Sequence, residues 1–346
     1  MATVPIEEPG PGRAATARFV PFAAGFILTA APNWTRTPPI AGTPLALLAG
    51  LWLFGRIGLA GLLPSPWAVA ADVVFLPALA LAVGPTIIRH SGLRNGALLG
   101  VLLGLAACNA AFHLDLAPLD AGAALRLAAG IFVLLIAMIG GRIVPAFTQS
   151  GLHVAGRAAT IGASGVLDGL AIGVLALAVA LDAAEAAPAT CAAAAGTAAL
   201  LHAVRLARWQ GWRTADLPIV LVLHAGYAWV PAGAALLAAA HLGWLPRTAG
   251  LHAWGAGAVG TMLIAVMSRA SLGHGGRVLA PDASTVAAYC LVFAGAALRV
   301  GGAVAGGRSE MALLTLGGGA WSLGYLLFGL RFLPIWLRPR ADGRPG

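Results

Sequence analysis

The sequence lacks lysine altogether and is poor in charge of either sign. Charged residues make up only 10% of its 346 residues, and all 21 residues counted as Lys or Arg are arginine. Hydrophobic residues make up 60%, and the mean hydropathy is +0.88. This composition is typical of integral membrane proteins. The arginines fall singly or in small groups rather than in one patch, which argues against a nucleic-acid partner and makes them topology signals.

Cysteine is also scarce. The three cysteines, Cys108, Cys191 and Cys290, lie in apolar runs and form neither CxxC nor CxxCH. Their arrangement argues against disulfides, a thiolate zinc site and covalently attached haem. No Ser-His-Asp or HExxH arrangement stands out. The sequence therefore shows no hydrolase or transferase motif, and whether the protein is an enzyme stays open.

Long apolar runs dominate what is present. About 20 residues of helix cross the roughly 30 Å of hydrocarbon in a bilayer, so the runs predict an all-α, polytopic transmembrane bundle of about 11 spans. The runs are 18–33, 43–63, 66–88, 93–114, 121–147, 158–181, 187–207, 216–239, 248–268, 283–300 and 309–331. We expect a disordered tail over 1–17, a single membrane domain over 18–331 and a cytoplasmic tail over 332–346.

The arginines indicate an orientation. Counted by alternate loops, fourteen lie on one side and seven on the other, which accounts for all 21. The richer side is expected to be cytoplasmic, which places the C-terminus inside and, with an odd number of spans, the N-terminus outside. The short first run then suggests that a helix upstream of it is missing.

Arg56, Asp72 and Asp168 lie within the apolar runs, where charge is costly and marks candidate functional positions. Arg56 and Asp72 flank the tight turn LLPSP, each about 9–10 Å below the same surface. They are predicted to form an ion pair that locks a helical hairpin. Asp168, about ten residues into its run, has no evident partner. It is either a proton relay or a hydrogen-bonded packing residue.

Four of the eight histidines form two pairs by depth. His202 and His224 lie roughly 5–12 Å below the inner surface, where they could share a ligand. His113 and His252 form a corresponding pair near the outer surface, and Asn109 is placed to orient the His113 ring. Imidazole is a common ligand of haem iron and copper. The alternative for each ring is a hydrogen bond to a carbonyl or hydroxyl group.

Four segments resemble the NnrS family, and the likeness runs from about Phe19 to the C-terminal RPRADGRPG. The segments are GFILTAAPNWTRTPPIAGTPLALLAGLWLFGR, GGRIVPAFT (140–148), LHAGYAWV (223–230) and LHAWGAGAVGTMLIAVMSRASLGHGGR (251–277). The resemblance implies a bacterial inner-membrane protein, usually of twelve helices, that contains haem and copper and is linked to nitric-oxide stress and denitrification. Members usually carry a His-x-His-Glu-like stretch before the first segment. Here that region reads PGRAATARFVPFAAGF, and the first helix is expected to be absent.

Carried onto this chain, the resemblance implies a noncovalent, b-type haem and copper as cofactors. The candidate ligands are His224, His252, His202, His113 and His274. His224 and His252 rank first as metal ligands because they are buried in spans. His274 is secondary, since 22 residues of continuous helix would hold it about 33 Å from His252.

Three functions remain open from the sequence. The first is a haem-binding protein that protects against nitric oxide. The second is a redox enzyme that consumes nitric oxide, which would need a proton path that includes Asp168. The third is a transporter or channel without a cofactor. The expected partners are the lipid bilayer and a small diatomic ligand such as nitric oxide.

Overall fold

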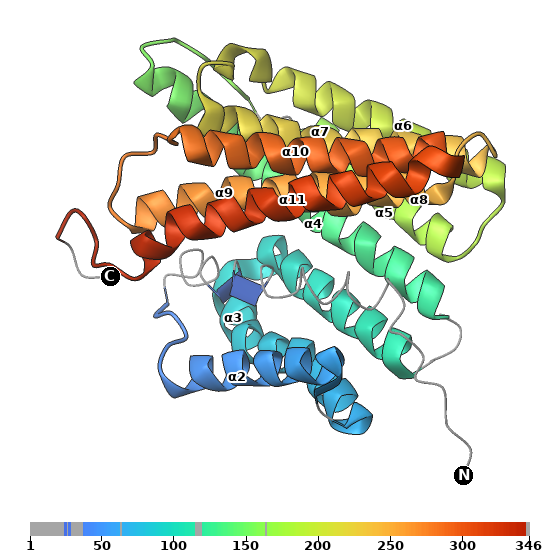
Figure 1. Ribbon diagram of the computed structural model, residues 1–346, viewed down its shortest axis with the longest axis horizontal. Helices are drawn as coiled ribbons and strands as arrows, with labels where there is room; N and C mark the ends of the chain where they lie inside the picture. Colours follow the sequence, from blue (N-terminus) through green and yellow to red (C-terminus); the bar gives the residue numbers. More distant parts are fainter. Residues whose placement is uncertain are drawn as a thin grey trace. The chain divides into compact units, whose positions relative to one another are not determined.

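The computed structural model describes residues 24–25, 27–28, 37–62, 64–114, 120–162 and 165–343, and in these ranges it is helical and contains no strand (Figure 1). Contacts divide the chain into two compact units, Met1–Ile131 and Phe132–Gly346. The boundary falls inside one helix, α4 (Ala121–Val154). Nothing in the apolar runs, which suggest one membrane domain, indicates this division.

Nine helices in the described ranges are long and apolar enough to cross a membrane, which confirms the predicted class of polytopic helical membrane protein. Two differences separate them from the eleven predicted spans. The run 18–33 lies largely outside the described residues, as does the tail expected over 1–17. The run 93–114 corresponds to a shorter apolar segment, Leu99–Leu114.

The first unit contains a helical hairpin. Helix α2 (Thr43–Ile57) continues into a π-helical turn, η1 (Gly58–Leu62), and α3 (Ser65–Leu114) follows. Gly61 has a φ of 80°, a conformation that glycine adopts at little cost, and the chain reverses there. The two helices approach closely, because a Cβ on Gly58 would lie 2.7 Å from Ala68 Cα.

Helix α3 folds back on itself. The Asn109 side chain donates a hydrogen bond of 2.9 Å to the carbonyl oxygen of Asp72, 37 residues earlier. A straight helix would hold these positions about 55 Å apart. The two arms correspond to Pro66–Arg89 and Leu99–Leu114 and agree with the separate runs predicted at 66–88 and 93–114.

The second unit is a bundle of antiparallel helices. Neighbours in sequence pack together, α5 on α6, α6 on α7 and α10 on α11 (Figure 1). The most buried spans are α7 and the composite span Arg247–His274, so these form the centre. Besides the last part of α4, the unit comprises α5 (Gly165–Ala183), α6 (Pro188–Arg208), η2 (Gly211–Thr214), α7 (Pro218–His241), α8 (Arg247–His252), η3 (Ala253–Val259), α9 (Gly260–His274), α10 (Ala283–Ala305) and α11 (Gly307–Trp336).

Small residues and a capped terminus hold α10 against α11. A Cβ on Gly295 would lie 2.7 Å from the carbonyl oxygen of Gly317, so the two backbones touch. Asp282 caps α10 by accepting a hydrogen bond of 3.0 Å from the Thr285 backbone and also pairs with Arg331 of α11. Burial would raise the pKa of the Asp282 carboxyl, but hydrogen bonds from Arg331, Thr285 and Ser284 outweigh it and hold the pKa well below its ordinary value.

The stretch RASLGHGGR ends α9 and receives the C-terminal segment. Gly276, with a φ of 66°, terminates the helix, and a Cβ there would lie 2.6 Å from Asp342 Oδ1. Ala341 donates a backbone hydrogen bond of 2.9 Å to Gly275. Helix α11 itself runs to Trp336, five residues into the tail expected at 332–346. Gly275 and Gly276 therefore let the chain reverse after α9 and let the C-terminal segment pack closely against it.

Candidate functional site

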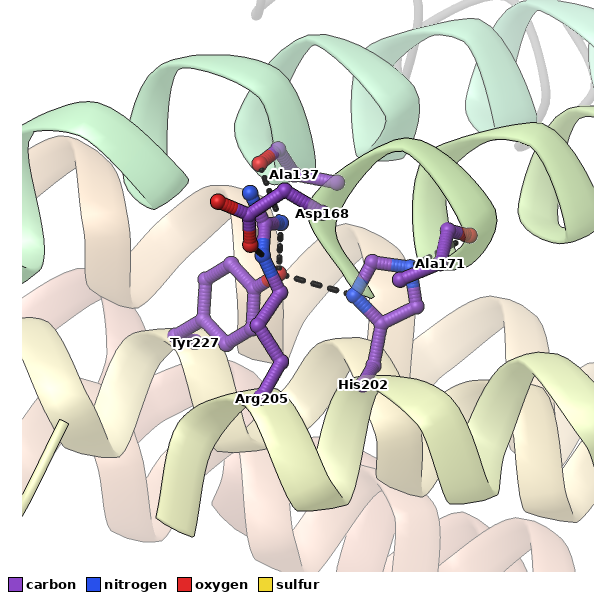
Figure 2. Close-up of polar contacts among 6 residues, drawn as sticks. All are labelled: Ala137, Asp168, Ala171, His202, Arg205 and Tyr227. Carbon is purple, nitrogen blue, oxygen red and sulfur yellow. Dashed lines mark hydrogen bonds and ion pairs between the residues drawn. The ribbon is translucent and has the colours of Figure 1, made fainter. Parts of the chain in front are cut away.

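A buried polar network connects α5, α6 and α7 in the second unit (Figure 2). His202 and Arg205 lie three residues apart on α6 and therefore share a face. They reach Asp168 of α5 and Tyr227 of α7. His202 and Tyr227 are 0% exposed and Arg205 is 2% exposed, so each polar atom in the network needs a partner within the protein.

Arg205 is the centre of the network. Its Nε donates to Asp168 Oδ1 over 2.6 Å, and its Nη1 donates to Tyr227 Oη over 2.6 Å and to the carbonyl oxygen of Ala137 over 2.8 Å. Asp168, which has no evident partner in the sequence, is thus paired with Arg205. Asp168 lies in the first turn of α5, which begins at Gly165 rather than at 158, and thus level with the last turn of α6.

The hydrogen bonds of His202 have a defined direction. The carbonyl oxygen of Ala171 can only accept, so His202 Nε2, 3.1 Å away, carries the proton. In the neutral ring, Nδ1 then accepts the hydroxyl proton of Tyr227 over 2.7 Å. His202 therefore has no free nitrogen for a metal in this arrangement.

This order of donors also bears on proton transfer. From Asp168 the network passes through the Arg205 guanidinium, which stays protonated in proteins, and ends at a backbone carbonyl. The arrangement contains no continuous path for a proton, and it favours the packing role of Asp168 over the relay.

Two glycines of the GGRIVPAFT segment make room for the network. A Cβ on Gly141 would collide with the Arg205 guanidinium, and a Cβ on Gly140 would lie 3.0 Å from Tyr227 Cδ2. On the other side, Trp209 covers Arg205, with Cζ 5.3 Å from the ring centroid. The guanidinium is therefore packed between α4 and an aromatic face.

His224 lies nearby with different partners. The Thr148 hydroxyl donates to the carbonyl oxygen of Val144 over 2.7 Å, so His224 Nε2, 2.8 Å from that hydroxyl, must be the donor to it. The remaining nitrogen, Nδ1, is buried and has no hydrogen-bond partner in the described part of the chain. Gly211 covers it, because a Cβ on this residue would lie 2.6 Å from Nδ1.

His252 occupies a different environment. It ends α8, directly before the π-helical stretch η3, and its ring is half-buried. No hydrogen bond or ion pair engages this ring within the described ranges. Carbonyl groups in and after η3 are held by side chains of α11, with Trp321 donating to Ala256 over 3.2 Å and Tyr325 donating to Gly260 over 2.7 Å. Isolated π-helical turns often occur at functional sites.

In the first unit, the structure brings Arg56 and Asp72 together in an ion pair. Asp72 Oδ2 also lies 2.9 Å from His113 Nε2. Asn109, which was expected to orient His113, instead donates to the Asp72 backbone. Nε and Nη1 of Arg56 are buried without an acceptor among the described residues.

His274 is not brought to His252. Helix α9 continues through Ser271 to His274, which is exposed. The fold-back that would let the two histidines share a metal is therefore absent. Among the described residues no group of three His, Cys, Asp or Glu side chains could hold a metal ion, so copper has no such donor set there.

The profile of the NnrS protein family matches residues 17–340. The chain belongs to the NnrS family. Comparisons with curated proteins and with solved structures gave no match. In this NnrS protein, GGRIVPAFT and LHAGYAWV contribute to one buried region, since the first supplies Gly141 and Thr148 and the second supplies His224 and Tyr227.

The haem expected for an NnrS protein can be tested against these donors. His202 does not fit, because both nitrogens are engaged. At His224, a haem beside Nδ1 would have to displace the turn that carries Gly211. His252 fits as a single protein ligand, since its ring is unbonded and reaches the surface of the bundle. Open space beside Gly255, three residues on, is consistent with this.

The residues that sequence reasoning missed are Arg205 and Tyr227 of the network and Thr148, the partner of His224. The spacing of His202 and Arg205 was an available signal, because residues three apart on a helix present one polar face. For Tyr227 the sequence contains no such signal, because the periodicity of α7 carries no sign of its hydrogen bonds. The partner of His224 lies 76 residues away on α4.

Proposed function

We propose that this NnrS protein holds a noncovalent, b-type haem on His252 and protects against nitric oxide. The observation that supports the proposal is the unbonded, half-buried His252 ring at the start of η3. A bound haem would supply an iron that takes up small diatomic molecules, nitric oxide among them.

The residues around His252 would hold this histidine in place as a haem ligand. Trp254, two residues after His252, donates to the carbonyl oxygen of Val230 over 3.1 Å and ties η3 to α7. Trp321 and Tyr325 tie the same stretch to α11. A histidine whose backbone is anchored on two sides is well placed to hold a cofactor in one orientation.

We also propose that the protein lies in the bacterial inner membrane with its C-terminus in the cytoplasm. The distribution of arginine, fourteen against seven, supports this orientation. Binding of nitric oxide is preferred to its consumption because the Asp168 network offers no continuous proton path. Copper has no proposed role, since no suitable group of three donors occurs in the described ranges.

The test is an absorption spectrum and haem assay of detergent-purified protein. We expect a Soret band in the wild type, its shift when nitric oxide is added to the reduced protein, and its loss in His252→Ala. His274→Ala is the matched control and should keep the band. Melting curves of all three proteins would show that they are equally folded.

Two results would overturn the proposal. Folded, colourless wild-type protein would favour a transporter without a cofactor. A full haem content in His252→Ala would place the ligand elsewhere.

A further inference from the structure

Arg299 is a charged residue in a membrane-spanning helix without a partner. It lies in α10 six residues before Ala305, which places it about 9 Å inside the helix end. Neither a hydrogen bond nor an ion pair to Arg299 occurs within the described ranges. Charged side chains inside membrane helices are costly and normally have a counter-charge or a function.

Other arginines of the second unit show what Arg299 lacks. Five of them contact a carboxylate, and these five include arginines at the ends of helices. The pairs are Arg205 with Asp168, Arg157 with Asp216, Arg247 with Asp182, Arg331 with Asp282 and Arg340 with Asp342. The nearby acid Glu310, in the first turn of α11, makes no ion pair with Arg299.

Glycines of α11 hold the Arg299 side chain along the helix surface. A Cβ on Gly317 would lie 2.9 Å from Arg299 Cγ, and a Cβ on Gly318 would lie 3.4 Å from Nη1. Any larger residue at Gly317 would push the arginine stem away. The guanidinium is therefore positioned by packing while its donors stay free.

Arg299 and His252 belong to the same end of the second unit. Helix α10, which carries Arg299, packs against α8 and η3, and His252 is the last residue of α8. His252 lies five residues after the start of its span at Arg247, about 7.5 Å inside. The depths of the two side chains thus agree to within about one residue. In Figure 1, α8 and the C-terminal end of α10 lie at the same end of this unit.

We propose that Arg299 is the counter-charge for a carboxylate of the ligand held on His252, which for a haem is a propionate. This inference rests on the proposed function. Guanidinium groups bind carboxylates through charge-assisted hydrogen bonds, and these strengthen when water is excluded. Arg299 is accordingly a positioning residue. The ligand of this site would carry both a metal ion that binds the His252 nitrogen and a carboxylate that binds Arg299.

The experiment compares two haems in three proteins. Wild type, Arg299→Gln and the control Arg308→Gln are loaded with haem or with haem whose propionates are methyl esters. Arg308 is exposed in the first turn of α11 and forms no ion pair with a described residue. The loss of haem to an excess of apomyoglobin is followed at the Soret band.

We expect Arg299→Gln to lose ordinary haem about tenfold faster than wild type or more, as removal of a charge-assisted hydrogen bond predicts. With the ester haem, wild type and Arg299→Gln should lose it at equal rates. Arg299→Lys should restore part of the difference. The reduction potential should fall in Arg299→Gln, because removal of a positive charge favours the oxidised iron.

The outcomes separate the two proposals. If haem is bound and lost in His252→Ala, but Arg299→Gln behaves as Arg308→Gln does with both haems, the role of Arg299 is overturned alone. An equal effect of Arg299→Gln on both haems would indicate a purely structural arginine and would also overturn it. A colourless wild type overturns both proposals.

Discussion

Two polar clusters of the second unit contain the same residue types but differ in how far they are paired. Around Arg205, the guanidinium, the tyrosine hydroxyl and both His202 nitrogens contact partners within the protein. At the α8 end, His252 and Arg299 have no such partners among the described residues. Half-buried polar groups without a partner in the protein keep donors and acceptors that a ligand could use.

The comparison teaches that a histidine and an arginine in a membrane helix do not by themselves define a site. A network in which every polar group has a partner stabilises and specifies the packing of its helices. A cluster whose polar groups lack partners can bind a ligand. The same substitution made in both clusters should therefore act on stability in the first and on ligand retention in the second.

The largest difference is expected for arginine. Arg205→Met leaves the Asp168 carboxylate unpaired and should lower the free energy of unfolding by about 3–5 kcal/mol. Arg299→Met should change it by less than about 1 kcal/mol. Thermal or denaturant unfolding in detergent measures both. Equal losses of unfolding free energy at the two positions would contradict the contrast between the clusters. If the double variant Asp168→Leu/Arg205→Met recovers part of the loss, the unpaired carboxylate is its cause.

Histidine should show a smaller difference. His202→Phe leaves the Tyr227 hydroxyl without its acceptor and the Ala171 carbonyl without its donor, at about 1–3 kcal/mol for each group. His252→Phe breaks no such bond, so the haem-free variant should unfold as the haem-free wild type does, while the Soret band of the loaded protein disappears. If His202→Phe instead removed the haem from a stable protein, the ligand assignment would have to be reversed.

Glycine should give the smallest effect. Gly141→Ala places a methyl group against the Arg205 guanidinium and should cost about 1–3 kcal/mol. Gly255→Ala enters open space and should be neutral or stabilising by up to about 1 kcal/mol. Unfolding midpoints of the two variants provide the measurement. A stable Gly141→Ala protein would mean that the guanidinium moves freely.

Some of the polar contacts could be predicted from the sequence, namely those between residues that a short turn joins. Arg56 and Asp72 are joined by a tight turn, so depth counting alone placed them together. Asp168 and Arg205 are joined by a similar hairpin, yet their pairing was missed because the apolar run begins at 158 and the helix at Gly165. A shift of seven residues moves an aspartate from mid-span to the first turn.

The ranking of the histidines depended even more on long-range contacts. Depth placed His202 and His224 together as ligands, but their hydrogen bonds are fixed by residues of α4, α5 and α7. The tautomer of His224 follows from a threonine on another helix. Periodicity along one helix carries no information about such partners.

Hydrophobic length and family motifs are local properties of the chain, so the sequence alone identifies a helical membrane protein of the NnrS family. The tertiary structure decided which polar side chains have partners. In a low-dielectric interior, partners within hydrogen-bond distance determine whether a histidine or arginine stabilises the helix bundle or remains free to bind a ligand. For this reason His202 and Arg205 belong to the scaffold, and His252 and Arg299 to the proposed binding site.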